Sequence, residues 1–527
     1  MSSMARPELP PDGVSSPLHN LGGWPSHWAR IQPARLAVED AERSLSWKCF
    51  EDRIGGLAAW LRAQRLAPGE RVAVFLRNRT AALEILFGTA RLGGIYLPIN
   101  LRLTAREIAF QLDDARPAAL FFESDLQETI DDALALARHA PPLSVPIGSA
   151  PNTYEAEIER RPPVCEALGL GADDPAILMY TSGTTGTPKG ALLPHRKALF
   201  NSLNAQGAFQ TTPDDRVLVV APLFHSLGLQ ILSLPLLHAG GSLLLQDRFE
   251  PAQVWKAVSE QEISYLGGVP EMHQRLYDAL LLRRGHLSDF PRLRFLFSAG
   301  AAISTELIRR FADLDLTVLQ GYGQTETSTL CCLDAANSLR KAGSVGRPVR
   351  HGEIRIIARE SIHQRPNLWR ETGIGETGEI VVRGPINMIG YWERERETRE
   401  TLIDGWIKTG DLATRDEEGF LSLVGRAREM LISGGENVYP AEVEAVYREY
   451  PGIREVAIVG VPDPKWGETG RAHVILDSGH VLDQEALLDW ARQRLASFKL
   501  PREIVIEEEF PRTASGKIRK HLLGSSP

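Results

Sequence analysis

Residues 71–99 read RVAVFLRNRTAALEILFGTARLGGIYLPI and indicate the class of fold. Two short apolar runs, 71–76 and 95–99, are typical of buried strands. Between them, residues 80–92 place apolar side chains at helical spacing, and Gly93 and Gly94 end the helix. A strand, a helix and a strand in this order predict a βαβ unit in a largely parallel sheet.

The same alternation continues on the carboxyl side. Residues 104–113 predict a helix, because Thr104 can cap its first turn and Glu107 completes a capping box. Residues 118–122 predict the next strand. Residues 217–245 contain no Asp, Glu, Lys or Arg, but prolines and glycines interrupt them, so we expect a buried strand, a helix and a strand rather than a membrane span.

The pattern changes after residue 375. Residues 378–384 and 419–424 are short strands bounded by turns, typical of a small antiparallel barrel. The last part of the chain predicts a compact α+β unit, with strands at 430–432, 456–461, 472–476 and 503–506 and helices at 441–450 and 483–495. We therefore predict an α/β protein: a disordered tail (1–16), a large N-terminal domain of parallel α/β sheets plus the barrel (17–426) and a small mobile C-terminal domain (427–527).

Composition excludes several classes of protein. The chain has 527 residues, a net charge of −8 and 43% hydrophobic residues, which argues against a general nucleic-acid binder and against wholesale disorder. Its four cysteines show neither metal-ligand spacing nor a disulfide framework, and Cys331 and Cys332 are expected to be a buried pair rather than nucleophiles. With no apolar signal segment in residues 1–16, we expect a soluble, cytoplasmic protein.

A glycine-rich and hydroxyl-rich stretch suggests phosphate binding. Residues 180–190 read YTSGTTGTPKG and directly follow an apolar run at 176–179. Glycines let the backbone approach a ligand, while amides, hydroxyls and a lysine can bind phosphate oxygens. The order Pro-Lys-Gly differs from that of a Walker A loop.

Three further motifs are weaker when taken singly. Residues 321–327, GYGQTET, offer an aromatic ring for a nucleobase and a carboxylate for magnesium. In residues 406–411, WIKTGD, the aspartate can hold ribose hydroxyls or form an ordinary Asx turn. Residues 511–520, PRTASGKIRK, place a lysine among small residues near the carboxyl end, where a solvated basic face is the simpler interpretation.

Together these motifs resemble the adenylate-forming superfamily of acyl-CoA synthetases, peptide-synthetase adenylation domains and firefly luciferase. The resemblance runs from about residue 45 to residue 520 and includes PLFH at 222–225, GRAR at 425–428 and GGENVYP at 434–440. It implies an enzyme that uses Mg²⁺, ATP, a carboxylic acid and coenzyme A. Such an enzyme forms acyl-AMP and pyrophosphate, and then transfers the acyl group to the thiol.

The resemblance also implies roles for individual residues. A loop closing on the β- and γ-phosphates would comprise Thr181, Ser182, Gly183, Thr184, Thr185, Gly186 and Lys189. Residues bordering the nucleotide base would be Gly300, Ala301, Ala302, Gly321 and Tyr322. Thr325 would contact the α-phosphate, and Glu326 would hold magnesium. Asp411 and Arg426 would hold the ribose, and Lys517 would bridge the attacking carboxylate and the nucleotide.

For the second half-reaction, the resemblance implies rotation of the small domain about Arg428, where relatives usually carry Asp or Lys. A coenzyme A channel would then be bordered by Ser433, Gly434 and Gly435. The alternative is an enzyme that loads the phosphopantetheine thiol of a carrier protein. A binding protein without turnover is disfavoured by the intact motifs, and a homodimer is expected only from the frequency of dimers.

The expected acid pocket is apolar and small-walled, which suits an aromatic or medium-to-long acyl group. Its lining would be His225, Leu227, Gly267, Gly268, Val269, Ala299, Gly300 and Gly323, although core packing is an equally good explanation for each. His225 replaces the aspartate of amino-acid-activating relatives, and Gly323 replaces the tryptophan of acetate-activating ones. Arg275 and Arg294 leave a dicarboxylic acid open.

Overall fold

The computed structural model of the chain describes residues 20–148, 153–164, 166–181, 188–282, 289–433, 436–463, 466–513 and 516–523. The predicted disordered tail lies outside them. The chain divides into two compact units, Met1–Glu353 with Arg383–Gly405 and Ile354–Val382 with Trp406–Pro527. The expected boundary after residue 426 and the hinge at Arg428 stay predictions.

In the first unit, an N-terminal sheet contains the strands of the predicted βαβ units. Its strand order is β18 (Gly390–Tyr391), β8 (Lys189–Pro194), β7 (Pro175–Thr181), β4 (Ile95–Pro98), β3 (Arg71–Phe75), β5 (Ala119–Glu123) and β6 (Leu143–Ile147). The pairs from β7 to β6 are parallel, whereas β8 joins β7 and β18 antiparallel.

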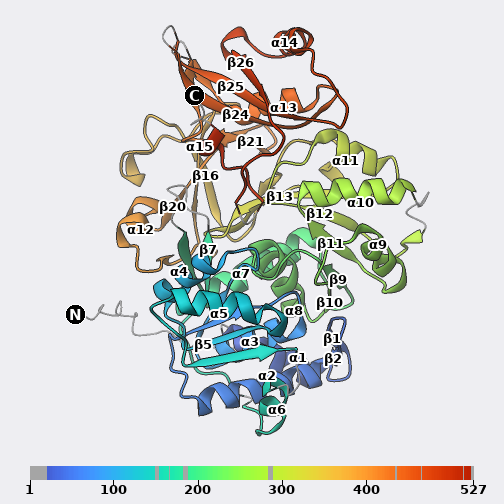
Figure 1. Cartoon of the computed structure of the whole chain (residues 1–527), viewed down its shortest axis with the longest axis vertical. Helices are drawn as coiled ribbons and strands as arrows, with labels where there is room; N and C mark the ends of the chain where they lie inside the picture. Colours follow the sequence, from blue (N-terminus) through green and yellow to red (C-terminus); the bar gives the residue numbers. More distant parts are fainter. Residues whose placement is uncertain are drawn as a thin grey trace. The chain divides into compact units, whose positions relative to one another are not determined.

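Helices cover both faces of this sheet. The α4 helix (Ala105–Ala115) and α5 (Gln127–Leu136), cyan in Figure 1, pack side by side on the face that presents Phe75, Leu97 and Leu120. The predicted capping box of Thr104 and Glu107 is present at the start of α4. On the opposite face, Trp60 of α2 (Trp47–Ala63) meets Phe121 edge to face. The strand between them is therefore apolar on both sides, as in buried parallel sheets.

A second, central sheet in the same unit carries the longer run of parallel strands. Its order is β15 (Arg347–Pro348), β14 (Ser328–Cys332), β13 (Val318–Gln324), β12 (Phe295–Ser298), β11 (Tyr265–Gly268), β9 (Arg216–Val219), β10 (Ser242–Leu245), β1 (Leu36–Glu39) and β2 (Ser44–Ser46). The strands from β13 to β1 are parallel. The uncharged residues 217–245 form β9, a π-helix (η3, Leu227–Ser233), α8 (Leu234–Ala239) and β10, as expected.

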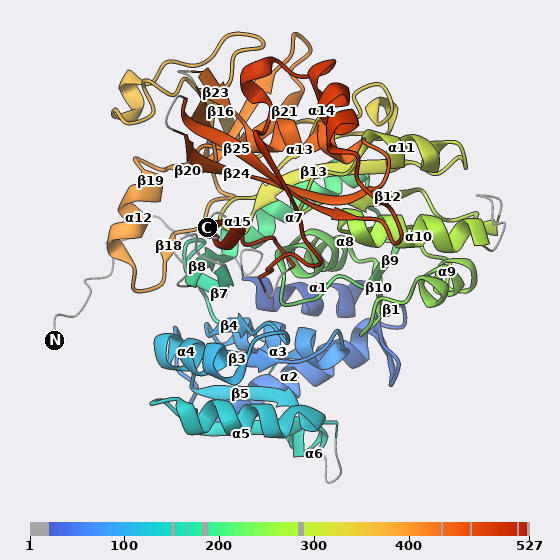
Figure 2. The same cartoon turned by 45° about the horizontal axis from the view of Figure 1, so that its top comes forward.

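Different helices pack against the two faces of the central sheet. One face is covered by α9 (Pro251–Glu260), α10 (Pro270–Leu282) and α11 (Thr305–Ala312), which enclose Leu218, Leu266 and Leu296 (Figure 2). On the other face, Phe209 at the end of α7 (His195–Phe209) meets Phe297. Because α7 also contacts β8 and β14, it touches both sheets of the unit.

The second unit contains a small sheet and an α+β body. The small sheet holds β16 (Glu353–Ile357), β17 (Gly378–Arg383), β20 (Trp406–Arg415) and β21 (Leu421–Arg426), which include the strands expected in a small barrel. The C-terminal sheet holds β22 (Leu431–Ser433), β23 (Glu436–Val438), β24 (Ile453–Asp463), β25 (Gly467–Leu476) and β26 (Glu503–Ile506). Its core packs against α13 (Pro440–Arg448) and α14 (Gln484–Arg492).

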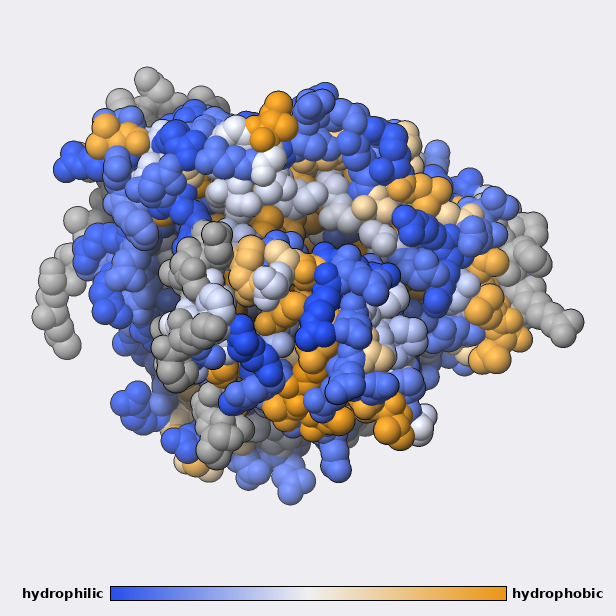
Figure 3. All heavy atoms as spheres, turned by 90° about the horizontal axis from the view of Figure 1, so that it is seen from above, coloured by the Kyte–Doolittle hydropathy of each residue, from blue (hydrophilic) through white to orange (hydrophobic). Residues whose placement is uncertain are grey.

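Figure 3 shows a face that is mostly hydrophilic, on which hydrophobic residues form small separate groups. The most exposed large apolar side chains that the structure describes, Leu282 and Val481, lie in different units. The homodimer therefore stays a prediction. None of the described helices is both long enough and apolar enough to span a membrane.

Candidate active site

The predicted base-binding and acid-binding residues follow the carboxyl ends of four neighbouring parallel strands. These strands, β9, β11, β12 and β13, are adjacent in the central sheet. The residues that follow or end them are His225, Leu227, Gly267, Gly268, Val269, Ala299, Gly300, Ala301, Ala302, Gly321, Tyr322 and Gly323. Parallel strands end at one edge of a sheet, which is where α/β proteins bind ligands. The topology therefore brings these residues to one edge.

Asn78, which lies just after β3 of the N-terminal sheet, fixes the segment that leads to His225. Its buried amide nitrogen donates to the carbonyl oxygens of Ala221 and Gln246, at 3.0 Å each. Its amide oxygen accepts from the backbone N–H of Leu223 at 2.9 Å. The Asn78 side chain therefore connects the segment that follows β3 to the segments that follow β9 and β10. It was not singled out from the sequence, where an asparagine between two arginines gives no distinctive signal.

The glycines of the expected acid pocket have packing roles. A Cβ on Gly267 would lie 3.0 Å from Leu232, and one on Gly268 would lie 3.2 Å from Met272. The space freed by the two missing side chains is thus taken by core residues. Val269 is 37% exposed at the strand end, and a Cβ on Gly300 would lie 3.5 Å from its side chain. The lining of the acid pocket stays a prediction.

The hairpin of β13 and β14 carries Thr325 and Glu326 in its turn. Gly323 pairs with Thr329 and Gln324 with Ser328 in register. A Cβ on Gly323 would lie 1.9 Å from the carbonyl oxygen of Ser328, so the hairpin itself requires glycine there. The hairpin therefore offers a second explanation for glycine at position 323, besides the deep acid pocket expected from the sequence.

Tyr391 contacts two of the predicted site residues and was missed in the sequence. Its hydroxyl donates to the Glu326 carboxylate at 2.9 Å, and the Lys189 ammonium lies 5.5 Å from the centre of its ring. Lys189 begins β8, to which β18 pairs, and the backbone N–H of Met388 donates to the Glu326 carbonyl at 2.7 Å. Because β18 has only two residues, no alternation of side chains could mark it as a strand.

The predicted phosphate loop is described only at its ends. Thr181 ends β7 and Lys189 begins β8, where the two residues pair in register. The Thr181 hydroxyl donates to the Lys189 carbonyl at 3.3 Å. Ser182, Gly183, Thr184, Thr185 and Gly186 lie outside the described residues, so their contacts stay predictions.

Glu326 fits a magnesium ion that is shared with phosphates. The described residues contain no group of three or more His, Cys, Asp or Glu side chains that could enclose a metal. Magnesium is usually held by one or two carboxylates together with substrate phosphates and water. A single half-buried carboxylate near Lys189 matches that donor set, and bound magnesium would neutralise phosphate charge.

A buried lysine lies behind this turn. Lys197 of α7 is fully buried, and its ammonium donates to the Ser328 hydroxyl. Burial lowers the pKa of Lys197 to about 7, although the Glu326 carboxylate acts to raise it and Arg196 lowers it.

In the second unit, the two predicted ribose residues face each other. Asp411 of β20 and Arg426 of β21 pair in register, and the Arg426 Nε lies 2.6 Å from the Asp411 carboxylate. Burial and the Arg426 charge lower the pKa of the Arg428 guanidinium.

Lys517 is exposed in a turn closed by the pairing of Arg512 with Ile518. Ser433 is buried and pairs with Gly467, whereas Gly434 and Gly435 lie outside the described residues. The roles implied for all these residues stay predictions.

The two arginines that left a dicarboxylic acid open have partners within the protein. Arg294 precedes β12, at the strand end opposite to Ala299, and lies 2.9 Å from the Asp215 carboxylate. Arg275 lies over the Phe249 ring.

Cys331 is fully buried and Cys332 half-buried, and burial raises the pKa of both thiols, that of Cys332 to about 12.

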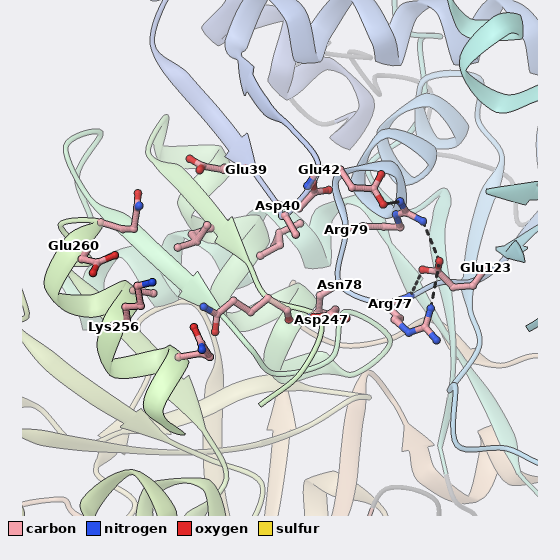
Figure 4. A pocket seen from close by; sticks show the side chains of 17 residues that line it. Glu39, Asp40, Glu42, Arg77, Asn78, Arg79, Glu123, Asp247, Lys256 and Glu260 are labelled. Atoms are coloured by element: carbon pink, nitrogen blue, oxygen red, sulfur yellow. Dashed lines mark hydrogen bonds and ion pairs between the residues drawn. The ribbon is translucent and has the colours of Figure 1, made fainter. Parts of the chain in front are cut away.

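A polar cavity of about 490 Å³ lies between the two sheets of the first unit (Figure 4). Within it, Arg79 lies between the carboxylates of Glu42 and Glu123, and the distance to Glu123 is 2.9 Å. Arg77 contacts Glu123 as well. These charges neutralise one another, and the lining includes none of the predicted site residues.

The sequence matches one family of known enzymes over most of its length. A family model described as AMP-binding enzyme matches residues 26–392, and the AMP-binding enzyme C-terminal domain matches residues 442–517. The chain belongs to the AMP-binding enzyme family. This match, with the CoA ligases named below, confirms the predicted superfamily and the predicted class, an AMP-forming acid–thiol ligase. It supports ATP-dependent acyl-CoA synthesis as the general reaction.

Relatives of this AMP-binding enzyme act on different acids. Feruloyl-CoA synthase of an Amycolatopsis species is 39% identical over 95% of this chain and 97% of that protein. Indoleacetate–CoA ligase of Aromatoleum aromaticum is 36% identical over 95% and 96% of the two chains. Long-chain-fatty-acid–CoA ligase FadD13 of Mycobacterium tuberculosis is 33% identical over 88% and 89%.

Solved structures confirm the predicted α/β fold class. ATP-bound MatB from Rhodopseudomonas palustris matches with a TM-score of 0.85 and 30% identity over 96% of this chain and 98% of that one. o-Succinylbenzoate CoA synthetase (MenE) from Bacillus subtilis, in complex with the acyl-adenylate OSB-AMP, matches with a TM-score of 0.83 and 28% identity over the same shares.

Tyr391→Phe tests the contact with Glu326. Removing a hydrogen bond to a carboxylate costs about 1.5–3 kcal/mol, so we expect the KM for Mg-ATP to rise about tenfold or more. Steady-state pyrophosphate release measures it. Tyr265→Phe is the matched control, because the Tyr265 hydroxyl is buried and bonds to Thr211 at 3.1 Å. Equal KM values for the two variants would contradict the role of Tyr391.

Lys197→Met tests the lowered pKa of this lysine. Above pH 7 the folded protein has released the Lys197 proton that the unfolded chain still holds, so the wild type gains stability as pH rises, by up to about 1.4 kcal/mol per pH unit. The variant lacks this gain. We expect the difference in Tm, wild type minus variant, to increase from pH 7 to pH 9 in thermal unfolding. A difference that stays constant would show that Lys197 keeps its proton throughout.

Proposed function

We propose that the protein is an aryl-CoA synthetase, which activates an aromatic carboxylic acid with ATP and transfers the acyl group to coenzyme A. One observation carries the adenylation step: Lys189 and Glu326, predicted to bind phosphate and magnesium, both contact Tyr391. The names of the feruloyl- and indoleacetate-activating relatives support an aromatic acid over a fatty acid.

In the proposed first step, a carboxylate oxygen of the acid attacks the α-phosphorus of ATP. The bond to the bridging oxygen of the β-phosphate breaks, and pyrophosphate leaves with its electron pair. Two anions must meet, so cations and hydrogen-bond donors have to stabilise the transition state. We assign this work to Lys189, Thr325 and Lys517, with Glu326 holding magnesium and with Asp411 and Arg426 on the ribose.

In the proposed second step, the coenzyme A thiol gives up its proton, and its sulfur attacks the acyl carbon of acyl-AMP. The bond from that carbon to the phosphate oxygen breaks and AMP leaves. We assign Ser433, Gly434 and Gly435 to the thiol channel and Arg428 to the hinge. His225 supports a substrate without an α-amino group. Its imidazole carries no negative charge, so it cannot replace the carboxylate that pairs with an α-ammonium group.

Lys517→Ala separates the two steps. We expect acid-dependent pyrophosphate release to fall at least about a hundredfold, because a cation bridging the reacting groups acts on the transition state of adenylation. Thioester formation from supplied aroyl-AMP should stay within about threefold of wild type. Lys499→Ala, in the same unit and paired with Glu442 at 2.6 Å, is the matched control and should retain both activities. Equal losses in both half-reactions of Lys517→Ala would refute its assignment.

A panel of acids tests the substrate class. Pyrophosphate release with Mg-ATP is measured for ferulate, indoleacetate, benzoate, palmitate, acetate and malonate, each with and without coenzyme A. We expect turnover with an aromatic acid that rises sharply with coenzyme A. Preference for palmitate or malonate would refute the aromatic class alone. A single burst that coenzyme A cannot relieve would favour carrier-protein loading, and no release with any acid would favour a binding protein without turnover.

A further inference from the structure

Lys197 is a buried lysine to which neither the family resemblance nor the proposed steps assign a role. It lies in the first turn of α7, with none of its side chain accessible to solvent. Removing an ammonium from water is costly unless protein groups replace its hydration. Its ammonium donates to the hydroxyl of Ser328, which begins β14 two residues after Glu326.

Ser328 has a backbone conformation that must be held by its surroundings. Its φ is +60°, in the left-handed region that a serine seldom adopts. Its carbonyl oxygen occupies the place where a Cβ of Gly323 would lie, and the pairing of β13 with β14 shifts register between Tyr322 and Gly323. The conformation of Ser328 therefore sets the direction in which the chain leaves the turn, and hence the position of residues 324–327.

The same face of α7 holds the next residue of β14. Asn201 lies four residues after Lys197, so the two side chains project from one face of the helix. The Asn201 side-chain oxygen accepts from the backbone N–H of Thr329 at 3.4 Å, and its nitrogen donates to the Gln230 carbonyl at 2.5 Å. Two polar side chains of one helix thus hold the first two residues of β14.

We propose that Lys197 is a positioning residue, which holds the turn carrying Glu326 in place through the hydroxyl of Ser328. It contacts neither nucleotide nor acid in this proposal. Its amino group fixes Ser328 in the left-handed conformation, and Ser328 fixes the turn. The Glu326 carboxylate is then already aimed when Mg-ATP binds. This inference rests on the proposed function, because it concerns the carboxylate to which magnesium binding is assigned.

A double-mutant cycle tests the proposal. Lys197→Met keeps the length of the side chain but removes the ammonium, and the milder Ser328→Ala removes only the hydroxyl. Calorimetry measures the affinity for ATP with and without magnesium, and thermal unfolding is followed in parallel. We expect each variant to bind Mg-ATP about tenfold more weakly and the double variant to bind no more weakly than either single one. Affinity for ATP without magnesium should change less than threefold.

Ser202→Ala is the matched control for Ser328→Ala. Ser202 lies on the same helix, is fully buried, and donates its hydroxyl to the Ala198 carbonyl at 2.7 Å. We expect this variant to bind Mg-ATP like the wild type, even where its Tm falls as far as that of Ser328→Ala.

Three outcomes would overturn the inference. Additive losses in the double variant would show that the two groups act independently. Mg-ATP affinities equal to that of the wild type would show that the contact is structural only. Equal losses with and without magnesium would show a general loosening of the fold. If the wild type itself bound no Mg-ATP, the proposed function would fail first, and this result is distinct from the other three.

Discussion

The alignment of neighbouring parallel strands in the central sheet is the constraint on which the candidate site depends. Leu218, Leu266, Leu296 and Val318 are buried against α9, α10 and α11. A slip of one residue in any of their strands would turn these side chains to the opposite face of the sheet and break this packing. Their common register places the segments that follow β9, β11, β12 and β13 at one edge. The chemistry of the site follows from where these strands end.

The Glu326 turn is held by segments that are remote in sequence. Tyr391 of β18 donates to the Glu326 carboxylate, and the backbone N–H of Met388 donates to the Glu326 carbonyl. Lys197 of α7 donates to the hydroxyl of Ser328, two residues after Glu326. Tyr391 and Lys197 belong to elements that are fixed in turn by sheet pairing or by packing against both sheets. A carboxylate anchored in this way loses little conformational freedom on binding a cation, which is the advantage of a preorganised site.

Much of the fold could be predicted because local patterns carried it. The apolar runs of β3, β4 and β5, the capping box of α4 and the interrupted run at 217–245 all appear as expected. Candidate site residues could be proposed from the sequence where motifs are contiguous, as at residues 321–327. Tyr391, Lys197 and Asn78 were not, because their contacts arise only when distant elements pack. A lysine in the first turn of a helix also resembles an ordinary surface residue.

The role of Glu326 in adenylation is tested most directly by acid-dependent exchange of pyrophosphate into ATP, compared between the wild type and Glu326→Gln with ferulate as the acid. We expect exchange that requires both ferulate and magnesium and that falls at least about a hundredfold in the variant, because the amide cannot hold the ion. Glu306→Gln, on α11 and paired with Arg310, should exchange like the wild type. Full exchange in Glu326→Gln would show that this carboxylate is not needed for adenylation.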